Sequence, residues 1–287
     1  MTSSRLKFDE IGEWSQLKLE IVRDYAAAYS MILTKQPLLN HVYVDAFAGA
    51  GVHKLKSTGE LIAGSPLNAL AVRPRFKELH LIDLRGERVE NLRGLTAGQD
   101  GVFIYEGDCN RILLDEVFPK IRYEDYRRAI CLVDPYGLHL DWRVIARAGQ
   151  MKSVEVFLNF PIMDMNRNAM WSSPENVDPA DVHRMNTFWG DESWRSSAYR
   201  NEKGLFGAIP TKRKGNHSIV GAFRTRLKDV AGFEFVPEPL AMTNSTGATV
   251  YHLFFASNNR TGAKIASDLF AKHRTSGNAP PRRGGRA

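Results

Sequence analysis

Apolar residues recur with two different periods along this chain, and each period predicts a different kind of element. In residues 8–33 the residues Trp14, Leu17, Ile21 and Tyr25 recur at helical spacing with charged residues between them, which predicts an amphipathic helix. Short, mostly apolar runs follow, and we interpret them as five buried strands at residues 41–46, 78–83, 102–105, 129–134 and 154–160.

Helix-like segments separate these runs. Residues 65–72 are expected to form a helix with Ser65 at the N-cap and Pro66 at the first helical position, after a polar loop over residues 52–64. Further helices are expected near 87–92, from 108 to about 117, and at 142–148. This alternation predicts an α/β fold with a mostly parallel sheet and helices on both faces.

The alternation breaks over residues 162–215, which we interpret as an insertion or cap after the fifth strand, its tryptophans serving as core residues of a small subdomain. It returns with a helix at 219–230, strands at 233–236 and 250–256, and a helix at 263–273. The short connector at 243–247 predicts antiparallel closing strands. The expected organisation is an N-terminal helical segment (1–40), a core domain (41–161 with 216–273), the insertion, and a disordered basic tail (274–287).

Composition narrows the class of protein. The 287 residues are 43% hydrophobic and 25% charged, as in a globular protein. With no apolar run of about 18 residues and no signal-peptide core, we expect no membrane association and a cytoplasmic location. Cys109 and Cys131 are too few for a disulfide framework. The net charge of +7, with basic clusters at residues 212–214 and 282–286, permits an RNA or DNA partner.

Candidate chemistry gathers where the predicted strands end. The first strand leads into Asp45-Ala46-Phe47-Ala48-Gly49-Ala50-Gly51, and a glycine-rich turn lets the backbone approach a ligand. Asp83, Asp108 and Asp134 lie at or just after the ends of the next three strands. Such a row indicates a nucleoside site on the carboxyl edge of an open sheet, although each aspartate alone could be a turn or helix-cap residue. A dinucleotide fingerprint is disfavoured, because no third glycine and no immediate helix follow Gly51.

In order and spacing these motifs resemble the class I S-adenosylmethionine-dependent methyltransferases, whose sheet is Rossmann-like with an antiparallel closing strand. The resemblance implies that the loop containing Asp45, Phe47, Ala48, Gly49 and Gly51 packs against the methionine half of S-adenosylmethionine. It further implies that two acids bind the rest of the cofactor: the ribose hydroxyls are assigned to Asp83 and the adenine amino group to Asp108.

The fourth strand ends in Asp134-Pro135-Tyr136-Gly137, which resembles the D-P-P-Y motif of methyltransferases acting on exocyclic amino groups of nucleobases. The resemblance implies a catalytic role for three residues: Asp134 and the Pro135 carbonyl would accept hydrogen bonds from the amine, and Tyr136 would stack on a base flipped out of its helix. One proline of the motif is missing here, and a simple strand-end turn is the alternative.

The whole set of motifs is similar to the three-Cys-motif partner protein (TcmP) family. Gly64-Ser65-Pro66, Leu158-Asn159-Phe160-Pro161 and the closing run at residues 251–258 carry this resemblance together with the motifs above. It implies a separate partner protein bearing three cysteines. Two functions therefore stay open: a nucleobase N-methyltransferase, and an inactive methyltransferase-like scaffold acting with that partner. No metal is implied, since His53, His139 and His217 lack ligand spacing and are expected on the surface or in loops.

Overall fold

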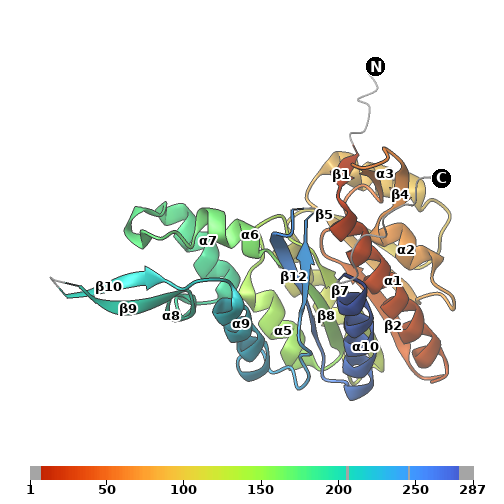
Figure 1. Cartoon of the computed structure of the whole chain (residues 1–287). Helices are drawn as coiled ribbons and strands as arrows, with labels where there is room; N and C mark the ends of the chain where they lie inside the picture. Colours follow the sequence, from red (N-terminus) through yellow and green to blue (C-terminus); the bar gives the residue numbers. More distant parts are fainter. Residues whose placement is uncertain (1–7, 205–206, 245, 278–287) are drawn as a thin grey trace.

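A mixed sheet forms the centre of the protein. The computed structural model describes residues 8–204, 207–244 and 246–277, and within them seven strands pair in the order β11-β12-β8-β7-β2-β5-β6 (Figure 1). The parallel strands are β2 (Asn40–Asp45), β5 (Glu78–Asp83), β6 (Val102–Glu106), β7 (Arg127–Val133) and β8 (Val154–Phe160). The long strand β12 (Thr249–Ala256) is antiparallel to both β8 and β11 (Leu240–Thr243). The predicted Rossmann-like sheet with an antiparallel closing strand is confirmed.

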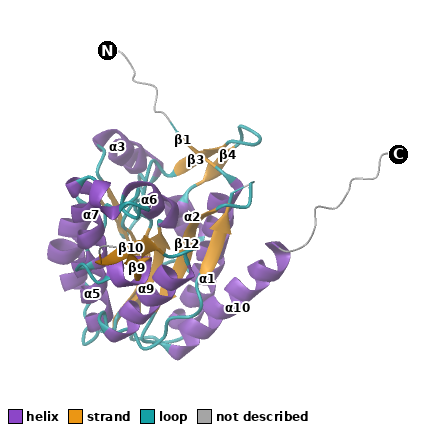
Figure 2. Ribbon diagram, turned by 60° about the vertical axis from the view of Figure 1, so that its left-hand side comes forward, coloured by secondary structure: helices purple, strands orange, loops and turns teal. Residues whose placement is uncertain are grey.

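Helices cover both faces of this sheet (Figures 1 and 2). One face packs against α1 (Glu13–Thr34), α2 (Ser65–Ala71) and α10 (Arg260–Gly277). The other packs against α4 (Cys109–Ile112), α5 (Trp142–Met151) and α9 (His217–Asp229). Each face of the sheet forms a hydrophobic core with the helices that cover it. Strand β12 contributes to both cores because successive side chains point to opposite faces: Phe254 packs on the α5 side and Phe255 on the α1 side.

A second, three-stranded sheet lies where a polar loop and the start of the first helix were expected. Strand β1 (Asp9–Ile11) pairs in parallel with β3 (Val52–Leu55), which pairs with β4 (Leu61–Ala63). The first helix therefore begins at Glu13, and residues 52–64 are a hairpin rather than a loop. Residues 9–11 were mistaken for helix because three residues carry too little periodicity to distinguish a strand.

Two further expectations are wrong, one about a strand and one about the first residue of a helix. The strand predicted at 233–236 forms only an isolated bridge between Phe235 and Ser257, and the edge strand is β11, seven residues later. Helix α2 has Gly64 as its N-cap, so Ser65 is the first helical residue and Pro66 the second. Helix α3 (Gly86–Leu95) is close to its prediction, and α4 continues through a π-helical turn (Leu113–Val117) and a 3-10 turn (Phe118–Lys120).

The insertion contains more regular structure than its weak periodicity suggested. It comprises α6 (Ile162–Asn168), a 3-10 turn (Pro174–Asn176), α7 (Pro179–Trp189), α8 (Trp194–Ala198) and the hairpin of β9 (Tyr199–Gly204) and β10 (Gly207–Lys212). The hairpin projects away from the sheet (Figure 1). Trp189 and Trp194 are buried core residues as expected, whereas Trp171 is exposed.

Helix α10 is the last element that the structure describes, and it continues to Gly277, so residues 274–277 are helical and not part of a tail. The arginines at 282–286 lie outside the described residues. Among the helices that the structure describes, none combines the length and the apolar character needed to cross a membrane.

Candidate active site

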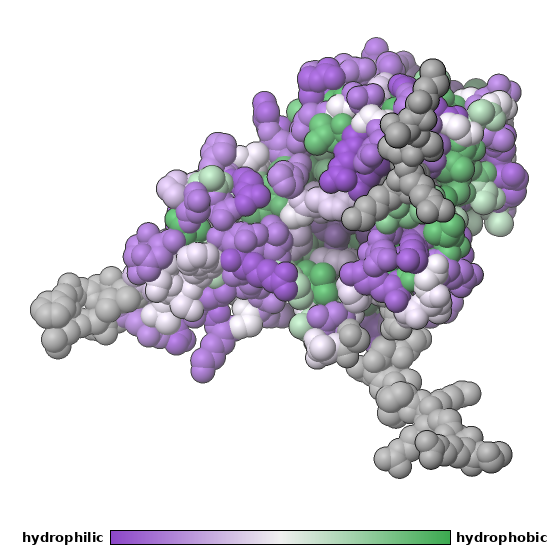
Figure 3. Space-filling model, turned by 90° about the horizontal axis from the view of Figure 1, so that it is seen from above, coloured by the Kyte–Doolittle hydropathy of each residue, from purple (hydrophilic) through white to green (hydrophobic). Residues whose placement is uncertain are grey.

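Two cavities meet at the carboxyl edge of the sheet, and two aromatic residues line both. The Asp83 cavity, of about 710 Å³, is lined by Asp83, Arg88 and Asp108 and by residues of α7. The Asp134 cavity, of about 470 Å³, is lined by residues 134–137, by β1 and by the start of α6. Phe47 and Tyr136 line both cavities. The insertion therefore contributes walls to each, and Figure 3 shows mostly hydrophilic residues on this side of the molecule.

The glycine loop after β2 is held by the strand beside it. The Ala48 N–H donates to the Ile82 carbonyl at 2.8 Å, and the Gly49 N–H donates to the Asp83 carboxylate at 2.9 Å. Gly49 and Gly51 have φ of 64° and 81°, a region that favours glycine. A Cβ on Gly51 would lie 3.0 Å from the Leu95 side chain. The N–H groups of Ala48 and Gly49 thus stabilise the loop itself. Gly51 packs against the Leu95 side chain and lines neither cavity.

Asp45 ends β2 beneath the loop and is completely buried. Burial raises its pKa to about 7, partly offset by the Ser65 hydroxyl and by the Phe47 N–H, which donates to Oδ1 at 3.3 Å. Its Oδ2 has no hydrogen bond of good geometry among the described residues. Asp45 lines neither cavity, so it supports the loop from below.

Asp83 and Asp108 both line the Asp83 cavity, and both also accept hydrogen bonds from backbone N–H groups. Asp83 is 5% exposed, and its Oδ1 accepts from the Arg85 N–H at 2.9 Å while its Oδ2 accepts from Gly49. The exposed Asp108 caps α4 by accepting from the Arg111 N–H at 3.0 Å. The helix-cap alternative for Asp108 is therefore observed, and its second oxygen accepts from Asn110 Nδ2 at 3.4 Å.

Asp134 is held by two residues that were not singled out as site residues. The buried Lys18 ammonium, from α1, forms an ion pair with Asp134 Oδ2. The Asn159 amide, from β8, donates from Nδ2 to Oδ1 at 2.8 Å. All three side chains line the Asp134 cavity. A signal for both existed in the sequence: Lys18 interrupts the apolar stripe of α1, and Asn159 interrupts an apolar strand.

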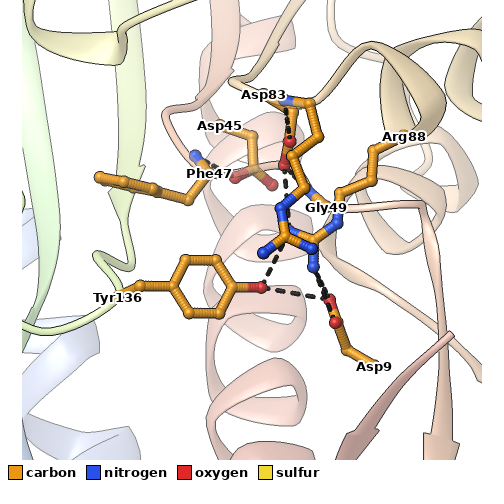
Figure 4. A network of polar contacts seen from close by, with 8 residues as sticks. Asp9, Asp45, Phe47, Gly49, Asp83, Arg88 and Tyr136 are labelled. Carbon is orange, nitrogen blue, oxygen red and sulfur yellow. Dashed lines mark hydrogen bonds and ion pairs between the residues drawn. The ribbon is translucent and has the colours of Figure 1, made fainter. Parts of the chain in front are cut away.

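Tyr136 is fixed through its hydroxyl while its ring stays accessible. The hydroxyl donates to Asp9 Oδ2 at 3.1 Å and accepts from Arg88 Nη1 at 3.0 Å, and the residue is 58% exposed (Figure 4). Burial of the hydroxyl and the neighbouring Asp9 raise its pKa to about 12, so it remains a donor. Pro135 is buried before it, and Gly137, at φ 61°, lies where a Cβ would come 2.8 Å from Asp164 Oδ2.

Of the three histidines expected on the surface or in loops, His53 differs from the expectation. It lies on β3, lines the Asp134 cavity, and its buried Nδ1 has no hydrogen-bond partner among the described residues. Burial and the nearby Lys18 lower its pKa, so the ring is neutral. Within the described ranges, no group of three or more His, Cys, Asp or Glu side chains could hold a metal ion.

No protein-family model matches the sequence, and no curated protein matches it. Among solved structures, the fold is similar to a Legionella pneumophila protein of the DUF519 family, with a TM-score of 0.52, 12% identity, and coverage of 92% of this chain and 91% of that one. It is also similar to an S-adenosylmethionine-dependent methyltransferase from Clostridium acetobutylicum, with a TM-score of 0.40, 10% identity, and coverage of 83% and 91%.

At such low identity the likeness concerns the fold. The chain has a Rossmann-like α/β fold, in which a seven-stranded, mostly parallel sheet with an antiparallel closing strand carries polar residues at its carboxyl edge. Membership of the TcmP family stays a prediction.

Proposed function

We propose that this protein is an S-adenosylmethionine-dependent methyltransferase that methylates an amino group of a nucleobase in RNA or DNA. The observation that carries the proposal is the junction of the two cavities: Phe47 and Tyr136 line both the cavity with two strand-end acids and the cavity with a strand-end Asp-Pro-Tyr turn. A donor in one cavity and an acceptor in the other would meet at this junction, where direct transfer requires the reacting atoms to lie in contact. Both volumes lie in the range of small-molecule sites.

The residues of the Asp83 cavity fit the cofactor. The Asp83 carboxylate has accepting capacity left beyond its two backbone N–H bonds, because an ionised carboxylate offers about four lone-pair sites. Asp83 would bind the ribose hydroxyls, Asp108 the adenine amino group, and Phe47 would border the methionine half. When bound, S-adenosylmethionine supplies the electrophilic methyl group.

The residues of the Asp134 cavity fit an amino group. The Lys18 ammonium pairs with one oxygen of the Asp134 carboxylate, and a carboxylate can accept further hydrogen bonds. Asp134 and the Pro135 carbonyl would each accept one N–H of the amine, which directs the nitrogen lone pair at the methyl group. The exposed Tyr136 ring would stack on the base. The new C–N bond replaces the methyl–sulfur bond, and the amine releases one proton to water.

The second candidate function is a methyltransferase-like scaffold that acts with a three-Cys-motif partner protein. The contacts of Asp134 favour it, because Lys18 and Asn159 each already bind one carboxylate oxygen, which gives the carboxylate a structural role and leaves it fewer lone pairs for an amine. In that case the ion pair would serve stability, and the cavity would need no amine.

The deciding experiment combines calorimetry with a transfer screen. S-adenosylhomocysteine is titrated into the protein, and radiolabelled S-adenosylmethionine is then supplied with total RNA, genomic DNA and protein as separate acceptors. We expect binding, and label on RNA or DNA that is lost in Asp134→Asn while cofactor binding is kept. Binding without transfer to any acceptor would favour the scaffold, and absence of binding would refute both the cofactor assignment and the methyltransferase proposal.

A further inference from the structure

Arg88 lines the Asp83 cavity and binds two residues, Asp9 and Tyr136, that line the Asp134 cavity. It is the third residue of α3 and is only 5% exposed, and it lines the Asp83 cavity. Its Nη1 lies 3.6 Å from Asp83 Oδ2 and donates to the Tyr136 hydroxyl at 3.0 Å. One guanidinium group therefore joins the acid assigned to the cofactor with the ring assigned to the substrate (Figure 4).

The other guanidinium nitrogen holds the N-terminal strand. Nη2 of Arg88 donates to both oxygens of Asp9, at 2.7 Å each, and Asp9 is the first residue of β1. The Tyr136 hydroxyl donates to the same carboxylate. Because β1 lines the Asp134 cavity, Arg88 fixes two of its walls at once, the strand and the tyrosine ring.

The three acceptors around Arg88 are not equivalent. The contacts to Asp9 and Tyr136 are hydrogen bonds of ordinary length, whereas the 3.6 Å contact to Asp83 is a looser ion pair. Nη1 is thus shared between Asp83 and Tyr136. A hydroxyl group donating to Asp83 would satisfy part of that carboxylate and weaken its attraction for Nη1. The guanidinium would then be held more completely by Tyr136 and Asp9, through charge-assisted hydrogen bonds in a partly buried site.

We propose that Arg88 is a positioning residue that couples occupancy of the Asp83 cavity to the order of Tyr136 and β1 at the Asp134 cavity. The inference rests on the proposed function for the identity of the ligand at Asp83. Its consequence is reciprocal: cofactor binding prepares the acceptor cavity, and a ligand stacked on Tyr136 strengthens cofactor binding by the same factor. Transfer is thereby favoured only when both cavities are filled.

The test measures this coupling by amide hydrogen exchange of the full chain, with and without saturating S-adenosylhomocysteine. In the parent we expect the ligand to slow exchange of segments 8–12 and 134–140 by about fivefold or more. Arg88→Met should bind the ligand and lose the slowing at both segments. Tyr136→Phe keeps the ring and the Arg88–Asp9 pair, so it should lose the effect at 134–140 and keep it at 8–12.

Arg93→Met is the matched control, because Arg93 lies on the same helix, is half-exposed and pairs only with Glu90 among the described residues. It should behave as the parent. If Arg88 only stabilised the fold, Arg88→Met would lower the stability of the protein, but the ligand would still slow exchange of both segments by the same factor as in the parent. This result would overturn the proposal. So would a parent that binds the ligand without slowing either segment.

Two other outcomes are also decisive. If Arg88→Met does not fold, Tyr136→Phe decides, since a retained effect at 134–140 contradicts the coupling. If the parent does not bind S-adenosylhomocysteine, the proposed function fails, and this inference falls with it for that separate reason.

Discussion

The Lys18 ammonium on α1 forms an ion pair with the Asp134 carboxylate just after β7, 116 residues later in the chain. The pair joins the first helix to the acceptor cavity. Because the Lys18 side chain is only 7% exposed, the charge of Asp134 matters for folding as well as for the proposed chemistry. Substitutions at Asp134 therefore have to be chosen to separate the two effects.

Removing the carboxylate should destabilise the protein through Lys18. Asp134→Ala leaves a buried ammonium without its partner, and we expect the free energy of unfolding to fall by about 3 kcal/mol in urea denaturation. Asp134→Asn retains an oxygen that can accept from Lys18 and should lose clearly less stability. Equal stability of Asp134→Ala and the parent would contradict the structural part of this role.

Under the proposed function, Asp134→Asn should also reduce methyl transfer by orders of magnitude, because a small misplacement of the amine is costly in the transition state. Affinity for S-adenosylhomocysteine should stay near that of the parent. Single-turnover transfer at saturating cofactor measures the first quantity and calorimetry the second. Normal transfer by this folded variant would refute the assignment of Asp134 as an amine acceptor.

Cofactor affinity should depend on Asp83. Asp83→Ala removes the acceptor for the ribose hydroxyls and also frees the N–H groups of Gly49 and Arg85. We expect S-adenosylhomocysteine to bind more weakly by about 1–3 kcal/mol in calorimetry. Asp115→Ala is the control, since Asp115 is an exposed residue of the same cavity lining. Parent-like affinity in Asp83→Ala would show that the ribose is bound elsewhere.

The contribution of Asp45 to stability should fall as the pH rises towards neutrality, because burial raises the pKa of Asp45 from 3.8 to about 7. Between about pH 4 and pH 7 the folded chain keeps a proton that the unfolded chain has lost, so this carboxyl lowers the free energy of unfolding with increasing pH. Buried Glu155, with its pKa raised to about 7, adds a second contribution of the same sign.

Asp45→Asn should accordingly stabilise the protein at pH 8, by roughly 1–3 kcal/mol, and change little at pH 4. Urea denaturation at the two pH values measures the difference. Asp100→Asn, at an exposed position, should leave the pH dependence unchanged. If the slope in Asp45→Asn equals that of the parent, Asp45 is ionised in the folded protein and its surroundings are more polar than the structure indicates.

Among the basic residues at 212–214, Lys212 should stabilise the fold, whereas Lys214 is available on the surface. The Lys212 ammonium donates to Asn166 Oδ1 at 2.9 Å and also to the Met170 carbonyl, and burial lowers its pKa. Lys212→Ala should therefore lower the unfolding temperature. The exposed Lys214 is the better candidate for a phosphate contact.

If RNA or DNA is the substrate, Lys214→Ala should weaken binding and reduce the slope of log affinity against log salt by about 1. Fluorescence anisotropy with a labelled RNA over a series of salt concentrations gives this slope. An unchanged slope would exclude Lys214 from the interface, and binding insensitive to salt would favour a protein partner.

Local pattern determined much of this protein. Runs of apolar residues indicate strands wherever both faces are buried, so β5 and β8 agree with their predicted ranges of 78–83 and 154–160. The strand ends followed directly, because parallel strands bring their carboxyl ends to one edge. Asp83, Asp108 and Tyr136 could thus be assigned to one edge of the sheet before their contacts were known.

Tertiary structure alone decided which side chains meet at that edge. Lys18, Arg88 and Asp9 are charged residues on separate elements, and no spacing in the sequence relates them to Asp134, Asp83 or Tyr136. Their pairing depends on α1 packing against the sheet and on β1 pairing with β3. Both strands are too short for their residue pattern to predict a strand. Periodicity reports which face of an element is buried, whereas the partner of a buried charge is chosen by the packing of the whole chain.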